Sequence, residues 1–237
     1  MKLLIRAIIV FALLIVSQIG NIAEAEKLRG GSVKVAILDS GCNIDYKEGI
    51  SLIDRVVKDY NGHGTLMARI IKEKAPFAEL YIVKVMDRDG LCPNEEAVIR
   101  GIEWAVSRGV NLLNISLRLR NSQRLHNAIR KAYDKGIIII AAAGNENSSV
   151  LLLDNGGGFN LKAVAYPAKY DEVIAVGAVD PAGRVYDGSI KGKEVEVFCQ
   201  GYKGRYAGTS VACAYATGII ATVSYTHLRA HETSLHL

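Results

Sequence analysis

Five short, almost continuously apolar runs constrain the fold of this chain more than any other feature. They are residues 33–39, 79–87, 110–117, 137–144 and 172–180. A strand that is apolar on both faces must be covered on both faces, as happens in a parallel sheet between two layers of helices. The sequence therefore predicts an α/β fold with a mostly parallel central sheet.

Helix-like stretches separate these runs. Residues 63–74 place Leu66, Ile70 and Ile71 on one side of a helix, and residues 122–136 form a second amphipathic stretch. Residues 94–109 open with Asn94 as a cap, carry acids in the first turn and end at glycine. These are the usual start and stop signals of a helix. The chain has 237 residues, half of them apolar, which suits one sizeable domain.

The charge pattern excludes one class of partner. The net charge is +5, and no block of basic residues stands out. Proteins that bind nucleic acid usually concentrate positive charge on a patch or tail. Nucleic acid is therefore not an expected partner.

Residues 1–25 have the pattern of a signal peptide. Lys2 and Arg6 give a basic start, residues 7–16 are apolar, and Ala23 and Ala25 offer small side chains for cleavage. An uncleaved anchor is the alternative, but the run is shorter than the roughly 20 residues that span a membrane. The expected location is secreted or extracytoplasmic, with no membrane attachment after cleavage.

Export would expose four cysteines to an oxidising compartment. Cys42, Cys92, Cys199 and Cys213 allow three complete disulfide pairings, and free buried thiols are equally consistent with the sequence. Their spacing matches no zinc-binding pattern. The disulfide state stays open.

Polar residues follow three of the apolar runs. Asp39 ends the first run, Ser116 is the second-last residue of the run 110–117, and Asn145 directly follows the run 137–144. Sites in parallel sheets form at the carboxyl ends of the strands. A functional site is therefore expected where these residues meet.

Two histidines lie outside the C-terminal tail. His126 belongs to an amphipathic helix, where a solvated helix face is the simpler interpretation. His63 lies between two glycines at a predicted helix start, and Ser210 follows Gly208 and Thr209 before an apolar helical stretch. A serine becomes a good nucleophile when a histidine takes its proton, and amides at a helix start favour the resulting oxyanion.

Four motifs carry a family resemblance. "VAILDSG", "GHGTLMA", "AAAGNEN" and "GTSVA" occur in this order, and from about Val33 to Ala221 the chain resembles the subtilisin-like serine proteases. The resemblance implies a three-layer α/β/α fold and an endopeptidase that forms an acyl-enzyme. It makes Ser210 the nucleophile, His63 the general base and Asp39 the residue that orients the imidazole. Asn145 would donate to the oxyanion together with the backbone N–H of Ser210.

The resemblance also implies a substrate cleft for extended polypeptides. Its substrate-binding residues would be Gly90, Leu91, Cys92, Ser116, Leu117, Arg118, Gly144 and Ala165. Family members often have glycine at the position of Arg118, which would either narrow the cleft or favour acidic substrate residues. The segment of residues 148–164 is longer than the corresponding segment is in most family members and would reshape the specificity pocket near Ala165. Ala214 and Tyr215 replace the usual Pro and His, with little expected effect on the chemistry.

No cofactor is expected. Many family members hold a tight calcium ion in a long loop, and none occurs here between Lys74 and Leu80, so we predict that this site is absent. Weaker calcium sites stay open, as does the oligomeric state. The chain also shows no pro-segment between Ala25 and Val33, so it either folds unaided or comes from an incomplete gene sequence.

The C-terminal tail has a separate origin in this interpretation. His227, His231 and His236 suggest a metal site, but residues 222–233 resemble the translation of a sequencing-library adapter, which accounts for the tail to residue 237. The predicted peptidase domain is therefore residues 26–221, incomplete at its C-terminus, followed by an adapter-derived tail.

Two other functions stay open at this point. The chain could be an inactive or truncated protein of the same fold that acts only in binding. A metal-dependent hydrolase that uses the tail histidines is a rival from a different class.

Overall fold

The computed structural model describes residues 32–146 and 162–234, with side chains described as far as residue 224. Its helices are α2 (His63–Lys74), α3 (Glu95–Ser107), α4 (Gln123–Asp134) and α5 (Thr209–Ser234). Its strands are β1 (Lys34–Asp39), β2 (Glu48–Ser51), β3 (Glu79–Lys84), β4 (Leu112–Ile115), β5 (Ile138–Ala142), β6 (Val173–Val179), β7 (Val195–Gln200), β8 (Tyr202–Lys203) and β9 (Tyr206–Ala207). The predicted signal peptide and residues 148–161 of the predicted long segment lie outside the described residues.

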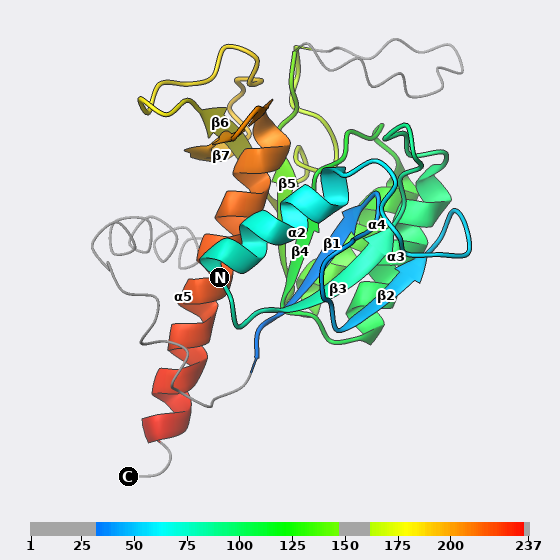
Figure 1. Cartoon of the computed structure of the whole chain (residues 1–237), viewed down its shortest axis with the longest axis vertical. Coiled ribbons are helices and arrows are strands. Elements are labelled where there is room, and N and C mark those ends of the chain that lie inside the picture. The colour runs from blue at the N-terminus through cyan, green and yellow to red at the C-terminus, as the bar shows by residue number, and fades with distance from the viewer. Residues whose placement is uncertain (1–31, 147–161, 235–237) are drawn as a thin grey trace.

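Strands β1 to β7 form one sheet in the order β2-β3-β1-β4-β5-β6-β7 (Figure 1). Every neighbouring pair in this sheet is parallel, which confirms the predicted sheet type. Strands β8 and β9 form a separate antiparallel hairpin just before α5. The edge strands β2 and β7 were not predicted, because both are only partly buried and neither is a continuous apolar run.

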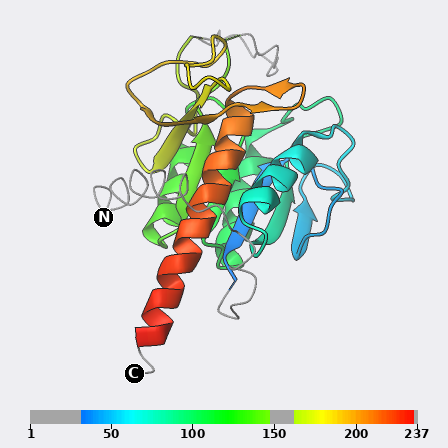
Figure 2. The same cartoon turned by 60° about the vertical axis from the view of Figure 1, so that its left-hand side comes forward.

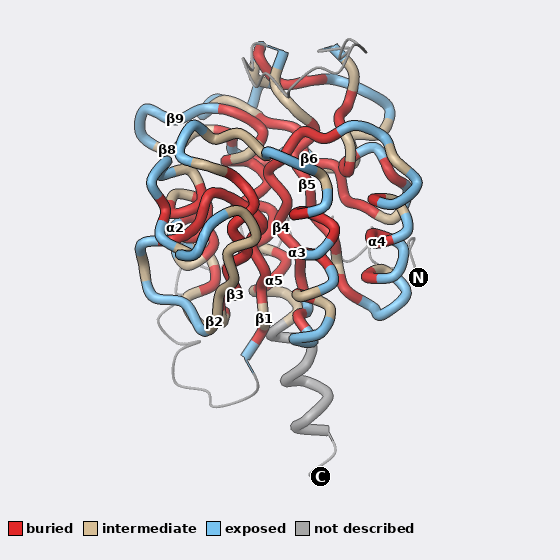
Figure 3. Tube along the Cα trace, turned by 90° about the vertical axis from the view of Figure 1, so that its right-hand side faces the viewer, coloured by how far each residue is buried: buried red, intermediate tan, exposed pale blue. Residues whose placement is uncertain are grey.

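Helices cover both faces of the sheet and make the three layers expected from the resemblance. Helices α2 and α5 lie on one face, and α3 and α4 lie on the other (Figures 1 and 2). Strand β1 supplies both cores: Ala36 and Leu38 pack with the α3–α4 side, and Val35 and Ile37 pack with the α2–α5 side. Figure 3 shows the buried residues concentrated along the central strands.

The predicted helix signals correspond to observed caps. Asn94 Oδ1 accepts a hydrogen bond from the Ala97 N–H at 2.8 Å, and Ser122 Oγ accepts one from the Leu125 N–H at 3.1 Å. Ile70 and Ile71 are buried in the core and Leu66 packs against the same core while staying partly exposed, as predicted; Met67, which was not predicted, is also buried there.

The four cysteines are free thiols in the structure. Burial raises the pKa of Cys92 and Cys199 to about 11 and that of Cys213 to about 12. Burial is also the main reason why the pKa of Cys42 is raised. Such thiols are protonated at neutral pH and therefore poor nucleophiles.

The topology brings several predicted site residues to one edge of the sheet. Asp39 is the last residue of β1, Ser116 directly follows β4, and Asn145 follows β5. Strands β1, β4 and β5 are neighbours in the sheet, so their carboxyl ends are adjacent. None of the described helices is long and apolar enough to cross a membrane.

Candidate active site

The Asp39 carboxylate and the His63 imidazole form a hydrogen-bonded pair. His63 Nδ1 lies 2.8 Å from Asp39 Oδ1 and 2.9 Å from Oδ2. The Asp39 side chain is fully buried, and the Ser40 N–H donates to its Oδ1 at 2.7 Å. The His63 side chain keeps 28% of its surface exposed, so the imidazole joins a buried anion to the solvent side of the site.

The environment of His63 shifts its pKa upward. Burial alone would lower the pKa, but the Asp39 carboxylate raises it through its charge and hydrogen bond, and Asp59 adds a smaller effect in the same direction. The pKa therefore lies above the ordinary value of 6.5. Because only the neutral imidazole accepts a proton, a base at this position would work above that raised pKa.

Close backbone packing fixes the start of α2 against the end of β1. A Cβ atom on Gly64 would lie 2.3 Å from the Gly41 carbonyl oxygen, so this position needs glycine. The Gly64 N–H donates to Ser40 Oγ at 2.9 Å. These contacts hold His63 beside the strand that carries Asp39.

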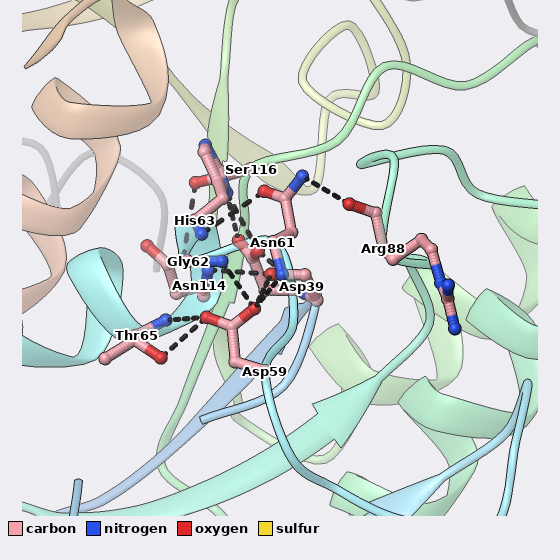
Figure 4. A network of polar contacts seen from close by, with 11 residues as sticks. Asp39, Asp59, Asn61, Gly62, His63, Thr65, Arg88, Asn114 and Ser116 are labelled. Carbon is pink, nitrogen blue, oxygen red and sulfur yellow. Dashed lines mark hydrogen bonds and ion pairs between the residues drawn. The ribbon is translucent and has the colours of Figure 1, made fainter. Parts of the chain in front are cut away.

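A second buried carboxylate, Asp59, organises the loop before His63 (Figure 4). Its Oδ1 accepts hydrogen bonds from the Asn61 N–H at 3.0 Å, the Gly62 N–H at 2.7 Å and Ser40 Oγ at 2.9 Å. Its Oδ2 accepts from both the N–H and the hydroxyl of Thr65, at 2.8 and 2.6 Å. This residue was not predicted from the sequence, although an aspartate four positions before the histidine in "DYNGH" is a visible signal.

We predict that Asp59→Asn destabilises the protein by about 2–4 kcal/mol at pH 7, because an amide presents one NH₂ group to hydrogen-bond donors that now face carboxylate oxygens. Burial tends to raise the Asp59 pKa, but its hydrogen bonds, chiefly those from Thr65, lower it below 3.8 overall. The carboxylate therefore contributes stability above the unfolded-state pKa, and this contribution is lost as the pH falls through the lowered folded-state pKa.

Urea unfolding of wild type and variant at pH 7 measures the difference. Asp45→Asn is a matched control, because Asp45 is exposed and accepts no hydrogen bond from the described residues, so its change should stay within about 0.5 kcal/mol. Equal losses in the two variants would contradict an organising role for Asp59.

A buried lysine supports the same loop from the other side. Lys84 ends β3 with only 1% of its side chain exposed, and its Nζ donates to Asp54 Oδ2 at 2.6 Å and to the Lys58 carbonyl oxygen at 2.9 Å. The Tyr60 ring covers the ammonium group at 4.9 Å. Lys84 thereby ties residues 54–60 to the central sheet just before His63.

Ser210 lies in the first turn of α5, which is fixed deep in the fold. Asn114 of β4 is fully buried, and its Oδ1 accepts hydrogen bonds from Thr217 Oγ1 at 2.9 Å and Cys213 Sγ at 3.3 Å. Helix α5 also packs against α2 (Figures 1 and 2). Ser210 itself is partly exposed, and within the described residues no hydrogen bond joins its hydroxyl to His63. Such bonds often form fully only in the substrate complex.

Asn145 is tied to the start of α5. Its Oδ1 accepts a hydrogen bond from the Thr209 N–H at 3.0 Å, while Thr209 Oγ1 accepts one from the Gly144 N–H at 3.2 Å. Gly208 packs closely against the same carboxamide, where an added Cβ would lie 3.0 Å from Nδ2. Oδ1 is engaged, and Nδ2 lies near the Ser210 turn with no hydrogen-bond partner among the described residues.

We predict that Asn145→Asp lowers kcat by about 100- to 1,000-fold, the scale of losing one oxyanion donor. Aspartate keeps an oxygen that accepts from the Thr209 N–H, so α5 should keep its position. It replaces the Nδ2 donor with an anionic oxygen, so a decrease in kcat reports the loss of the donor. Steady-state kinetics on one peptide substrate measure it. Asn127→Asp, an exposed change on α4, should leave kcat unaltered, and an unaltered kcat in Asn145→Asp would contradict the donor role.

The predicted substrate-binding residues lie in two segments beside this centre. Gly90, Leu91 and Cys92 are partly buried, and Asn61 connects to their loop by donating to the Arg88 carbonyl oxygen at 3.1 Å (Figure 4). Ser116, Leu117 and Arg118 are buried, Gly144 adjoins Asn145, and the N–H of buried Ala165 donates to Ala143 O at 3.1 Å. Leu117 and Arg118 make no backbone hydrogen bond to a described residue.

The turn between α2 and β3, where the sequence predicts no calcium loop, contains a lysine contact. It holds no long acidic loop, and Lys72 Nζ donates to the Pro76 carbonyl oxygen and, at 3.0 Å, to that of Ala78. The Lys72 ammonium group therefore lies against two carbonyl oxygens of this turn. Across residues 32–146 and 162–224, no group of three His, Cys, Asp or Glu side chains could hold a metal ion. The side chains of His227, His231 and His236 lie outside the described residues.

His126 differs from its prediction as a merely solvated residue. Its Nε2 lies 3.0 Å from Glu172 Oε2, and its ring stacks on Tyr170 with centroids 4.2 Å apart. The sequence could not show these contacts, because Tyr170 and Glu172 lie on another segment, the latter 46 residues away. His126 on α4 thus belongs to a surface cluster on the α3–α4 side of the sheet.

Comparisons with known proteins agree with this architecture. Residues 30–233 match the subtilase family, described as Peptidase_S8. The chain is 34% identical to subtilisin DY of Bacillus licheniformis over 227 residues, covering 84% of this chain and 79% of that protein. It is 32% identical over 220 residues to the minor extracellular protease Epr of Bacillus subtilis (strain 168), covering 82% of this chain but only 32% of Epr.

Solved structures show the same fold. A mutant of the protease domain of PatA superposes with a TM-score of 0.67 at 25% identity, covering 80% of this chain and 78% of that one. The prenylagaramide maturation protease PagA gives a TM-score of 0.69 at 23% identity, covering 87% and 81%. The fold is therefore that of the subtilisin-like serine proteases. The chain belongs to the subtilase family.

Proposed function

We propose that this protein is a serine endopeptidase that hydrolyses peptide bonds through an acyl-enzyme formed on Ser210. The observation that carries the proposal is the Asp39–His63 pair, in which a buried carboxylate holds Nδ1 of a part-exposed imidazole. The other ring nitrogen, Nε2, is left to accept a proton. Helix α5 packs against α2, which begins at His63, and its first turn carries Ser210, the one serine preceded by Gly-Thr in the chain.

The reaction follows from these groups. His63 Nε2 takes the Ser210 hydroxyl proton as Oγ attacks the substrate carbonyl carbon, and the carbonyl oxygen becomes an oxyanion that accepts from Asn145 Nδ2 and the Ser210 N–H. The imidazolium, stabilised by Asp39, then gives its proton to the leaving amine as the C–N bond breaks. Water repeats these steps on the ester, releases the acid and restores Ser210.

Substrates would bind as extended chains along residues 90–92 and 116–118. The backbone of Leu117 and Arg118 makes no hydrogen bond to a described residue and is therefore free to pair with another strand.

The N-terminal residues support export with cleavage after Ala25. N-terminal sequencing of protein recovered from the medium of an expressing bacterial culture would test this; a mature form that retains Lys2 would contradict it.

A burst experiment tests the acyl-enzyme. An excess of an activated ester such as a p-nitrophenyl ester should release close to one equivalent of nitrophenol per chain before slower turnover, with or without a chelator. A binding-only protein of this fold would show neither burst nor turnover. A burst lost in the chelator would favour metal-dependent chemistry instead.

A further inference from the structure

The side chain of Arg118 occupies a buried position beside the proposed oxyanion site. Arg118 is only 8% exposed, and its Nη2 donates to the Asn145 carbonyl oxygen at a long 3.4 Å. A Cβ on Gly144 would lie 2.5 Å from Nη2 and 3.3 Å from Cζ. The guanidinium therefore lies directly over the Gly144–Asn145 backbone, and glycine is what lets it approach.

This cation lacks a counter-charge among the described residues. No ion pair joins Arg118 to a described carboxylate, and its Nε is a buried donor with no hydrogen-bond partner. Desolvation by burial lowers the pKa of Arg118, yet a guanidinium remains charged in proteins. A buried charge without a partner is costly, so an anion that binds there gains more than one that binds an exposed arginine.

Among the described residues, the other neighbours of this position supply no anion. The Ile190 side chain approaches Gly144 from another side, with Cδ1 3.2 Å from the same added Cβ. Ala165 is joined to Ala143 through its N–H, and Leu119 donates to the Tyr166 carbonyl oxygen at 2.8 Å. Within the described part of the chain, a ligand group reaching Arg118 from the reaction centre would thus meet a cation without a counter-charge among apolar and backbone groups.

We propose that Arg118 selects an acidic side chain, glutamate or aspartate, on the substrate residue whose carbonyl carbon is attacked. The proposal rests on the proposed function. The substrate carbonyl oxygen would lie at the Asn145 carboxamide, and the side chain of that substrate residue branches one atom from the carbonyl carbon. The guanidinium contacts the backbone of the same Asn145, so a side-chain carboxylate is positioned to pair with it. A neutral side chain would leave the cation unpaired.

Matched substrates test this without any substitution. Peptides that differ only in Glu or Gln before the cleaved bond have nearly the same shape and differ in charge. We expect kcat/KM to be about 10- to 100-fold higher for Glu at pH 8, the scale of one charged hydrogen-bonded contact. Equal values, or a preference for Gln, would overturn the proposal.

Variants locate the effect. Arg118→Met keeps the approximate length of the side chain but removes the charge. The preference for the Glu peptide should disappear, and the Gln peptide should be cleaved at least as well as by wild type. Arg100→Met removes an equal charge from an exposed position on α3 and should keep the preference. Loss of the preference in both variants would show a general charge effect and contradict a specific role for Arg118.

A binding measurement separates this inference from the catalytic proposal. Calorimetry on Ser210→Ala with acetylated tetrapeptides ending in Glu or Gln compares the side chains alone, because both peptides carry the same terminal carboxylate. Tighter binding of the Glu peptide by about tenfold or more supports the inference even if wild type proves inactive. No difference overturns it, even if wild type hydrolyses peptides.

Discussion

Replacing Ser210 by alanine is expected to lower kcat for peptide hydrolysis by about 10⁵- to 10⁶-fold, because no other group in the site can form the acyl intermediate. The hydroxyl makes no hydrogen bond to a described side chain, and the residue is partly exposed, so the free energy of unfolding should change by less than about 0.5 kcal/mol. A large catalytic loss without a loss of stability is the signature of a nucleophile.

Two measurements on the same preparation test this expectation. Peptide hydrolysis is followed to long times at high enzyme concentration, and urea unfolding is measured alongside. Ser224→Ala removes a partly buried serine from the same helix and should keep full activity. Activity of Ser210→Ala within tenfold of wild type would contradict the proposed nucleophile.

Asp39→Asn should lower kcat by about 10⁴-fold. The asparagine NH₂ group would donate to His63 Nδ1, so the imidazole proton would move to Nε2 and that nitrogen could no longer accept the serine proton. The position of the ring should be kept, because an amide matches the size of the carboxylate. The decrease in kcat thus arises from the wrong tautomer of His63 and not from a loss of fold stability.

The pH dependence provides an independent check on the same pair. Asp39 raises the His63 pKa above 6.5, so kcat/KM of wild type should fall as the pH decreases through a value above 6.5. Without the carboxylate the pKa decreases, and the acid limb of Asp39→Asn should move to lower pH. Profiles of kcat/KM between about pH 5 and pH 9 measure the acid limb of each protein. An acid limb at the same pH in both proteins would contradict the electrostatic role of Asp39.

The sequence predicted the centre of the fold better than its edges. Strands β1 and β3 to β6 are buried on both faces. Burial on both faces requires apolar side chains on both, so these strands appear in the sequence as apolar runs. Strands β2 and β7 lie at the two ends of the sheet order and have only partial burial, so their residues carry no such run. Caps such as Asn94 and Ser122 were predictable because their partners lie three residues away.

The site was predictable where chemistry depends on a local motif. Asp39 and His63 lie 24 residues apart, and their contact was expected because the motif around each residue resembles that of one protease family. The hydrogen bonds of Asp59 to Ser40 and of Lys84 to Asp54 join segments 19 and 30 residues apart, and no periodicity reports such contacts. Arg118 was recognised as an unusual residue of the sequence. Its burial against Gly144, without a described counter-charge, could only be seen in the structure.

The most direct test of the account is labelling with an active-site fluorophosphonate, followed by mass spectrometry of the labelled peptide. We predict that folded wild-type protein takes up one label on Ser210, that Asp39→Asn is labelled far more slowly, and that Ser210→Ala is not labelled. Circular dichroism on the same samples confirms that each protein is folded. A folded wild-type protein that takes up no label, or takes it up at another residue, would contradict the central claim.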